Sequence, residues 1–326
     1  MDKQVRFFSL TSLFVSLIIF VIKFQAYRIT TSQAIFSEAM ESIVNILAAA
    51  MAFGVLWYAS KPADKDHPYG HGKAEYLSAA LEGGLIAFAA FLIIVESVQA
   101  FFENKPLHSL DYGVLLLIST ALLNALLGWV LVRLSKKKNS AALEASGKHI
   151  LADVKTTIGV FIGLTLVVIT KIYWLDRLIA ILVAVHLIKE GYEVIRSSLG
   201  GLLDEEKETV IQEVQELINK NKLEGIIQVH HLRIMRSGNY HHMDAHVVVP
   251  EFWSVETAHD ETNKYEKMIF KDYSFTGEIH FHIDPCRKLY CQFCDVKNCP
   301  VRKEEFKHYR EISLTELTSK EEPENI

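Results

Sequence analysis

The distribution of apolar residues divides the chain into two parts. Residues 1–203 form long apolar runs separated by short polar stretches, and the runs are long enough to cross the hydrocarbon core of a bilayer as helices. We predict six such helices, at residues 7–24, 34–58, 77–102, 112–134, 143–172 and 175–195. The last run is interrupted by Lys189 and Glu190, so it departs most from the pattern of a membrane span.

The basic residues predict how these helices are oriented. Lys and Arg concentrate at the N-terminus, in the loop after the second span and in the loop after the fourth, whereas the opposite side carries fewer, among them Lys23 and Lys171. Because basic loops stay in the cytoplasm, we expect both termini to be cytoplasmic, in a multi-pass protein of the plasma or inner membrane. The first run has no Ala-x-Ala-like end, which favours a retained helix over a cleaved signal peptide.

The second part has the mixed pattern of a small α+β domain. Helical and strand spacings follow one another in five segments: helix 205–221, strand 228–235, strand 240–249, helix 254–270 and strand 276–283. This α-β-β-α-β order predicts an open-faced cytosolic domain of about 80 residues, of ferredoxin-like or metallochaperone-like type, which is large enough to have its own core.

Composition gives the domain boundaries. We expect a six-helix transmembrane domain at 1–203, the cytosolic domain at 204–285, a cysteine-rich extension at 286–310 and an acidic, disordered tail at 311–326. The net charge of −5 is mild and no basic, aromatic-interleaved patch is present, so the sequence does not indicate nucleic-acid binding.

Two polar pairs lie within the apolar runs. His149 and Asp153 are four residues apart near the start of the fifth run, and Glu41 and Asn45 have the same spacing in the second. On helices, each pair lies on one face, and two such pairs can supply the carboxylate, amide and imidazole ligands of one divalent metal ion. The simpler alternatives are a hydrated helix end for the first pair and helix–helix hydrogen bonds for the second. Because ionisable groups are costly in a membrane, the two pairs together favour a metal site.

All four cysteines lie close together in the sequence, as Cys286, Cys291, Cys294 and Cys299. A compact four-thiolate zinc site is the simplest interpretation. The spacing of the first three cysteines is also similar to that of a plant-type iron–sulfur protein. A thiol sensor and reduced cysteines without metal are further alternatives.

Over residues 7–285 the chain resembles the cation diffusion facilitator family of proton-coupled divalent-metal exporters. The resemblance rests on the two polar pairs, on the loop K-P-A-D-K-D-H-P-Y-G-H-G-K-A-E at residues 61–75, on S-L-G-G-L-L-D at residues 198–204, and on the α-β-β-α-β domain. The loop is the most specific of these motifs. In the family the second span usually carries His or Asp and then Asp, where this chain has Glu41 and Asn45, so the usual patterns for zinc and manganese do not apply directly.

The resemblance implies several metal sites, a proton-coupled mechanism and a homodimer. Glu41, Asn45, His149 and Asp153 would bind the transported ion. The other implied ligands are Asp64, His67 and His71 in the loop, and His230, His246, His282 and Asp284 at the dimer interface of the cytosolic domain. A backbone-bonded turn is the alternative for the loop, and half-exposed histidines without an ion are the alternative for the strands.

The resemblance therefore predicts an exporter of Zn²⁺, with Mn²⁺, Fe²⁺ and Co²⁺ as alternatives, that exchanges the ion for protons and contacts membrane lipid. The same ions would serve as structural or regulatory ligands. The rival hypothesis is a membrane-anchored metal sensor or storage protein, which would not need the intramembrane pairs. The chain contains no nucleophile elbow or phosphate loop, so we do not expect an enzyme.

Overall fold

A computed structural model of the chain describes residues 3–103, 106–138 and 141–322, which form two compact units. The first unit comprises the described residues up to Val55 and those from Ser78 to Ser198. The second comprises Leu56–Leu77 and the described residues from Leu199 onward. The loop between the second and third long helices is therefore part of the second unit.

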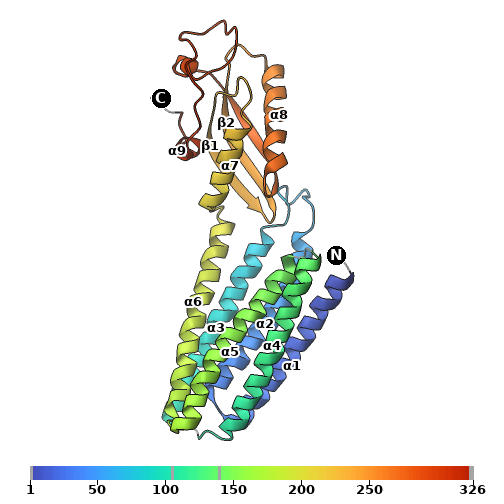
Figure 1. Ribbon diagram of the computed structural model, residues 1–326, viewed down its shortest axis with the longest axis vertical. Coiled ribbons are helices and arrows are strands. Elements are labelled where there is room, and N and C mark those ends of the chain that lie inside the picture. The colour runs from blue at the N-terminus through green and yellow to red at the C-terminus, as the bar shows by residue number, and fades with distance from the viewer. Residues whose placement is uncertain (1–2, 104–105, 139–140, 323–326) are drawn as a thin grey trace. The chain divides into compact units, whose positions relative to one another are not determined.

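Long helices lie side by side in the first part of the chain (Figure 1). They are α1 (Lys3–Thr30), α2 (Gln33–Ala59), α3 (Ala74–Glu103), α4 (Leu110–Lys138), α5 (Ala141–Thr170) and α6 (Trp174–Leu202). In the described part of the chain, α1 to α5 are long and apolar enough to cross a membrane, while α6 does not meet the same criterion. The helical membrane fold predicted from the apolar runs is confirmed with five apolar helices, and the sixth predicted span is a helix that is more polar than the other five by this criterion.

Small residues let two of the helices approach closely. A Cβ added at Gly83 of α3 would lie 2.8 Å from the carbonyl oxygen of Gly191 in α6, and a Cβ at Gly191 would lie 2.8 Å from that of Gly83. Backbones in such contact need glycine on both sides, which is a common way for membrane helices to associate. A Cβ at the neighbouring Gly84 would meet nothing within 4 Å.

Lys23, one of the basic residues that the sequence places on the side opposite the termini, is a buried residue of helix α1. Helix α1 continues to Thr30, and the Lys23 side chain is buried, with its Nζ 2.6 Å from Oε2 of Glu38 in α2. The Thr157 hydroxyl of α5 donates to the same carboxylate oxygen at 2.8 Å. The predicted span ends at residue 24, just after this lysine, but the lysine has a buried counter-charge and the helix continues beyond it.

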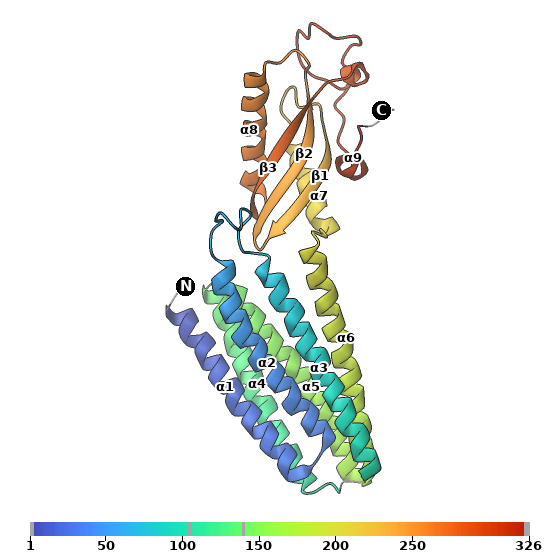
Figure 2. The same cartoon turned by 180° about the vertical axis from the view of Figure 1, so that it is seen from behind.

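The second unit contains a three-stranded sheet in the order β1-β2-β3. Its elements are α7 (Glu208–Lys220), β1 (Gln228–Ser237), β2 (Tyr240–Val249), α8 (Val255–Asp272) and β3 (Thr276–Pro285). Strand β2 pairs antiparallel with β1 and parallel with β3. The predicted α-β-β-α-β order is confirmed, and Figure 2 shows the sheet with the helices beside it.

The two faces of this sheet have different chemistry because side chains alternate along a strand. On β2, the buried Met243, Ala245 and Val247 join the apolar core formed with α7 and α8. The alternate positions, which include His242 and His246, therefore point to the opposite face. This alternation places the histidines where they can reach ligands or solvent.

The prediction of a disordered tail is wrong for residues 311–322. Helix α9 (Leu314–Thr318) begins with a capping box between Ser313 and Glu316. Ile312 and Leu317 are 1% and 0% exposed and belong to the core of the second unit. Two apolar anchors and a helix cap are enough to order a segment whose average composition is acidic. Residues 323–326 lie outside the described residues.

Candidate metal sites

The four residues predicted to bind the transported ion line one small cavity of the first unit. Helix α2 carries Glu41 and Asn45 on one face, and α5 carries His149 and Asp153. The cavity has a volume of about 20 Å³, which is roughly the space that one water-sized sphere needs. The i, i+4 spacing explains why both pairs face it.

The contacts within this cavity are polar and only partly satisfied. The Asn45 Nδ2 donates to Oδ2 of Asp153 at 2.7 Å, and Nε2 of His149 lies 3.9 Å from Oδ1 of Asp153. The Thr156 hydroxyl lies 3.4 Å from Oε1 of Glu41. The Glu41 Oε2 is buried without a hydrogen-bond partner. A buried carboxylate oxygen with no donor is costly, and the donor set around it fits a divalent cation.

Sequence reasoning missed two acidic residues near this site. Glu190 of α6 also lines the cavity, although in the sequence it counted only as an interruption of the sixth span. Glu38 lies one turn before Glu41 on α2 and is held by Lys23 and Thr157. Both could have been found from the cost of single charges inside apolar runs.

The loop residues Asp64, His67 and His71 come together as predicted, with ligand atoms within 4.8 Å of one another. The Asp64 carboxylate lies 3.2 Å from Nδ1 of His67 through Oδ1 and 3.3 Å from Nε2 of His71 through Oδ2. The His67 backbone N–H also donates to Asp64, which lowers the pKa of this carboxyl. The Tyr58 ring packs edge-on against His71, a contact the sequence did not indicate.

The loop is fixed against the hairpin of the same unit. A Cβ at Gly72 would lie 2.2 Å from the carbonyl carbon of Ser237, so only glycine allows this approach. The Gly72 N–H donates to the Ser237 hydroxyl at 3.2 Å, and Lys73 pairs with Asp204 at 2.8 Å. The two sequence motifs, residues 61–75 and 198–204, therefore meet in space.

In the α-β-β-α-β domain of the second unit, His230, His246 and Asp284 form a second group whose ligand atoms lie within 4.8 Å of one another. The Nδ1 of His246 is 2.9 Å from Oδ2 of Asp284, and Nε2 of His230 is 3.8 Å from the same oxygen. The exposed His282 lies at the margin, with Nε2 3.7 Å from Oδ1 of Asp284. Burial lowers the pKa of His230, and its Nδ1 has no hydrogen-bond partner. Imidazole nitrogens beside a carboxylate are ligands that suit a metal ion.

Strand register produces this group. His230, His246 and His282 stand side by side on three adjacent strands, and the register shifts between His230 and Arg233. His231 at this irregularity has a φ of 52°.

Other histidines have different roles. His241 is buried against Phe275 and pairs with the Tyr273 hydroxyl, and His242 contacts Glu278. The exposed His259 contacts Asn263. The sequence alone therefore could not tell the candidate metal ligands from the other histidines, because the distinction depends on the register of the strands.

The four cysteines are only partly brought together. Cys286, Cys294 and Cys299 pack in one cluster around the buried Tyr290, and all four are free thiols. Among the described residues, the metal-ligand groups are the loop group and the histidine group, so the predicted four-thiolate arrangement is not formed in this structure.

Comparison with known proteins bears on what these sites serve. The sequence model of the cation efflux transmembrane domain matches residues 9–203, and that of the cation efflux protein cytoplasmic domain matches residues 207–286. The chain belongs to the cation efflux family. The resemblance stated from the sequence motifs is therefore confirmed.

Named relatives of this cation efflux protein extend over most of the chain. It is 34% identical over 266 residues to the uncharacterized transporter sll1263 of Synechocystis sp., with 81% of this chain and 85% of the relative covered. It is 28% identical to the cation-efflux pump FieF of Shewanella oneidensis, covering 87% and 95% of the two chains. It is 25% identical to the manganese efflux system protein MneP of Bacillus subtilis, covering 78% and 87%.

The family and the five apolar helices establish the class of protein. This cation efflux protein is a multi-pass membrane transporter that exports divalent metal cations, and it is not an enzyme. The sequence-based expectation of transport is confirmed at this level.

Proposed function

We propose that this protein exports Zn²⁺ from the cytoplasm in exchange for protons, and that Glu41, Asn45, His149 and Asp153 bind the transported ion. The observation that carries the proposal is the cavity lined by α2, α3, α5 and α6, into which the two polar pairs of α2 and α5 bring two carboxylates, an amide and an imidazole around a space for one ion. Both termini would then be cytoplasmic, as the basic loops predict.

The donor set guides the choice of metal. One imidazole nitrogen with three oxygen donors suits a borderline cation, and four ligands suit the tetrahedral preference of Zn²⁺. Glu190 lines the same cavity and offers a further oxygen, which would favour the higher coordination numbers of Mn²⁺. Mn²⁺, Fe²⁺ and Co²⁺ are therefore the alternative substrates.

Proton exchange follows from the ligand chemistry. A metal ion binds a neutral imidazole and ionised carboxylates, so protons and metal compete for His149, Glu41 and Asp153. Binding would also exchange the hydrogen bond from Asn45 to Asp153 for bonds to the ion, because the amide oxygen must turn inward. Protonation on the far side of the membrane would release the ion, and the protonated site would return.

We also propose that the cytosolic domain forms a homodimer and senses metal. The group of His230, His246 and Asp284 would bind a regulatory ion on the open face of the sheet, and the exposed His282 could add a ligand. The loop group of Asp64, His67 and His71 would bind another ion. Metal concentration in the cytoplasm could then act on a domain that lies outside the transport site.

Flux in reconstituted vesicles tests the transport proposal. With an imposed pH gradient, uptake of Zn²⁺, Mn²⁺, Fe²⁺ and Co²⁺ is compared at equal concentration, with proton movement recorded in the same vesicles. We expect Zn²⁺ uptake with opposite proton flow. Zn²⁺ uptake that does not respond to the pH gradient would refute exchange, and preferred uptake of another ion would replace Zn²⁺ as the substrate.

A further inference from the structure

The cysteine-rich extension lies beyond the part of the chain that the family accounts for. The cytoplasmic-domain match ends at residue 286, so Cys291, Cys294 and Cys299 lie outside it. Cys286 continues strand β3, and its N–H donates to Val249 at 2.8 Å. From there the extension covers Val248 and Ile227, with Tyr290 and Cys294 buried against them.

Backbone N–H groups point at three of the four sulfurs. The backbone N–H groups of Glu251 and Val296 donate hydrogen bonds to the sulfurs of Cys286 and Cys294, respectively. The Lys303 N–H donates to Sγ of Cys291 at 3.4 Å. Such donors stabilise thiolates, yet a buried thiolate still needs a positive charge beside it. A metal ion supplies that charge.

Arg302 holds the turn that contains the middle cysteines. Its guanidinium donates to the carbonyl oxygens of Cys291 and Cys294 at 2.9 Å each and to that of Val296 at 2.8 Å. These three bonds fix both ends of the C-x-x-C segment from one side chain. A tight turn with two sulfurs on it is the usual start of a thiolate metal site.

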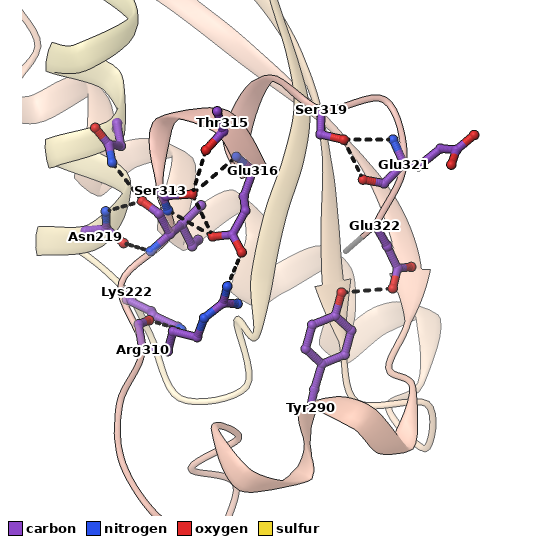
Figure 3. A network of polar contacts seen from close by, with 12 residues as sticks. Asn219, Lys222, Tyr290, Arg310, Ser313, Thr315, Glu316, Ser319, Glu321 and Glu322 are labelled. Carbon is purple, nitrogen blue, oxygen red and sulfur yellow. Dashed lines mark hydrogen bonds and ion pairs between the residues drawn. The ribbon is translucent and has the colours of Figure 1, made fainter. Parts of the chain in front are cut away.

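The tail is tied to the domain and to the extension, and Figure 3 shows the contacts of Asn219 and the one between Tyr290 and Glu322. We name residues 311–322 the C-terminal strap. The Ser319 carbonyl accepts from the His231 N–H at 2.8 Å, and Asn219 bonds both backbone groups of Ile312. At its end, Glu322 accepts a hydrogen bond from the Tyr290 hydroxyl at 2.9 Å and pairs with Arg287.

We propose that Cys286, Cys291, Cys294 and Cys299 bind one zinc-class metal ion through four thiolates, and that this ion fixes the C-terminal strap on the domain. Cys286, Cys294 and Cys299 already pack in one cluster, and Cys291 is joined to Cys294 by the short turn that Arg302 holds. Metal binding would draw the four sulfurs together around the ion. Tyr290 lies between Cys286 and Cys291 in the sequence, and its hydroxyl donates to Glu322. The segment that would hold the ion is therefore also the segment that contacts the end of the strap.

Four thiolates in so short a segment suit a closed, tetrahedral structural site for a zinc-class ion. This site would be separate from the transport cavity, so its loss and the loss of transport can be told apart.

Metal content of the purified full-length protein tests the site. Variants in which all four cysteines become serine are compared with wild type and with His230→Ala/Asp284→Ala, which leaves the thiols intact. We expect the cysteine variant to lose one tightly held zinc per chain and the histidine variant to keep it. Equal zinc in wild type and the cysteine variant would overturn the proposal, as would visible iron–sulfur absorption or a disulfide in the wild-type protein.

A wild-type measurement covers the case in which the cysteine variant does not fold. Replacement of the bound ion by Co²⁺ gives thiolate-to-cobalt charge-transfer absorption, and mass spectrometry shows which cysteines an alkylating reagent modifies. We expect this absorption, with all four cysteines protected until a chelator is added. Its absence, or equal modification with and without metal, would contradict a four-thiolate site.

Hydrogen exchange tests the link to the strap. On removal of the metal from wild type, we expect faster exchange in residues 311–322 and at the His231 amide, while α8 stays protected. Unchanged exchange in the strap would show that the ion does not hold it. A variant Glu322→Gln should loosen the strap but keep the metal, and loss of metal from this variant would contradict the direction of the coupling.

Discussion

At the scale of residues, Asn45 is the feature that most distinguishes the proposed transport site. It donates to Asp153 at 2.7 Å, so its amide already contacts the acid that would share the ion. Spacing alone predicted Glu41, Asn45, His149 and Asp153, because i, i+4 pairs in apolar helices have few other uses. The cost of a charge inside an apolar run marks Glu190 and Glu38 as candidates, but only packing shows that Glu190 lines the cavity and that Glu38 pairs with Lys23.

Asn45→Asp should change metal choice. A further carboxylate strengthens binding of hard and borderline cations, and one more group must lose its proton before metal binds. We expect relative uptake of Mn²⁺ over Zn²⁺ to rise in vesicles and the pH dependence of uptake to steepen. Ser42→Ala, next to the site on the same helix, is the control. Unaltered selectivity would mean that Asn45 does not bind the ion.

His241 should make the cytosolic domain sensitive to acid. Burial lowers its pKa to about 4, whereas the unfolded chain has a value of about 6.5. Below pH ~6.5 the unfolded state takes up a proton that the folded state resists, so stability falls between about pH 6.5 and 4, by up to roughly 3 kcal/mol. Urea unfolding of the domain across this range measures the slope. His241→Phe should flatten it, whereas the exposed His259→Gln should not; an equal slope in all three would exclude His241 as the cause.

At the scale of elements, the spacing of apolar residues and the turn-forming residues between them predicted the helices and strands of the α-β-β-α-β domain well. Strand β2 has the predicted bounds, and α7, α8, β1 and β3 differ from prediction by a few residues at their ends. The parallel pairing of β2 with β3, which aligns His246 with His282, depends on contacts distant in sequence. The order of the C-terminal strap was not predicted because its composition is acidic on average, although Ile312 and Leu317 are buried.

The two anchors give a prediction about the strap. Leu317→Ala removes a fully buried side chain from the core and should cost roughly 2–5 kcal/mol of domain stability. Leu314→Ala, at a partly buried position on the same short helix, should cost clearly less. Thermal or urea unfolding compares them. Equal, small effects would show that the strap does not contribute to the core.

Helix packing in the first unit offers a matched pair of glycines. Gly83→Ala places a Cβ 2.8 Å from the Gly191 carbonyl oxygen and from Cγ1 of Ile195, so α3 and α6 must separate, at a cost of about 1–3 kcal/mol. Gly84→Ala meets nothing within 4 Å and should be neutral or slightly stabilising. The melting temperatures of both variants in detergent measure this difference. Similar melting temperatures would argue against close packing of α3 and α6 at Gly83 and Gly191.

At the scale of the whole molecule, metal-binding chemistry is present in both units. The first unit holds the cavity proposed for transport among apolar helices, and the second holds the loop group, the histidine group and the cysteines. The class of transporter could be predicted from the sequence because the intramembrane pairs and the loop motif are local. The identity of the metal could not, because it depends on how many of the oxygens around the cavity reach the ion.

Metal uptake by vesicles that contain Asp153→Ala tests the central claim most directly. The wild-type protein, this variant and Glu193→Gln, an exposed acid of α6, are reconstituted at equal density under the same pH gradient. The account predicts that Asp153→Ala is folded and dimeric but abolishes both Zn²⁺ uptake and the coupled proton flow, while Glu193→Gln behaves as wild type. Wild-type uptake by Asp153→Ala would contradict the assignment of the transport site.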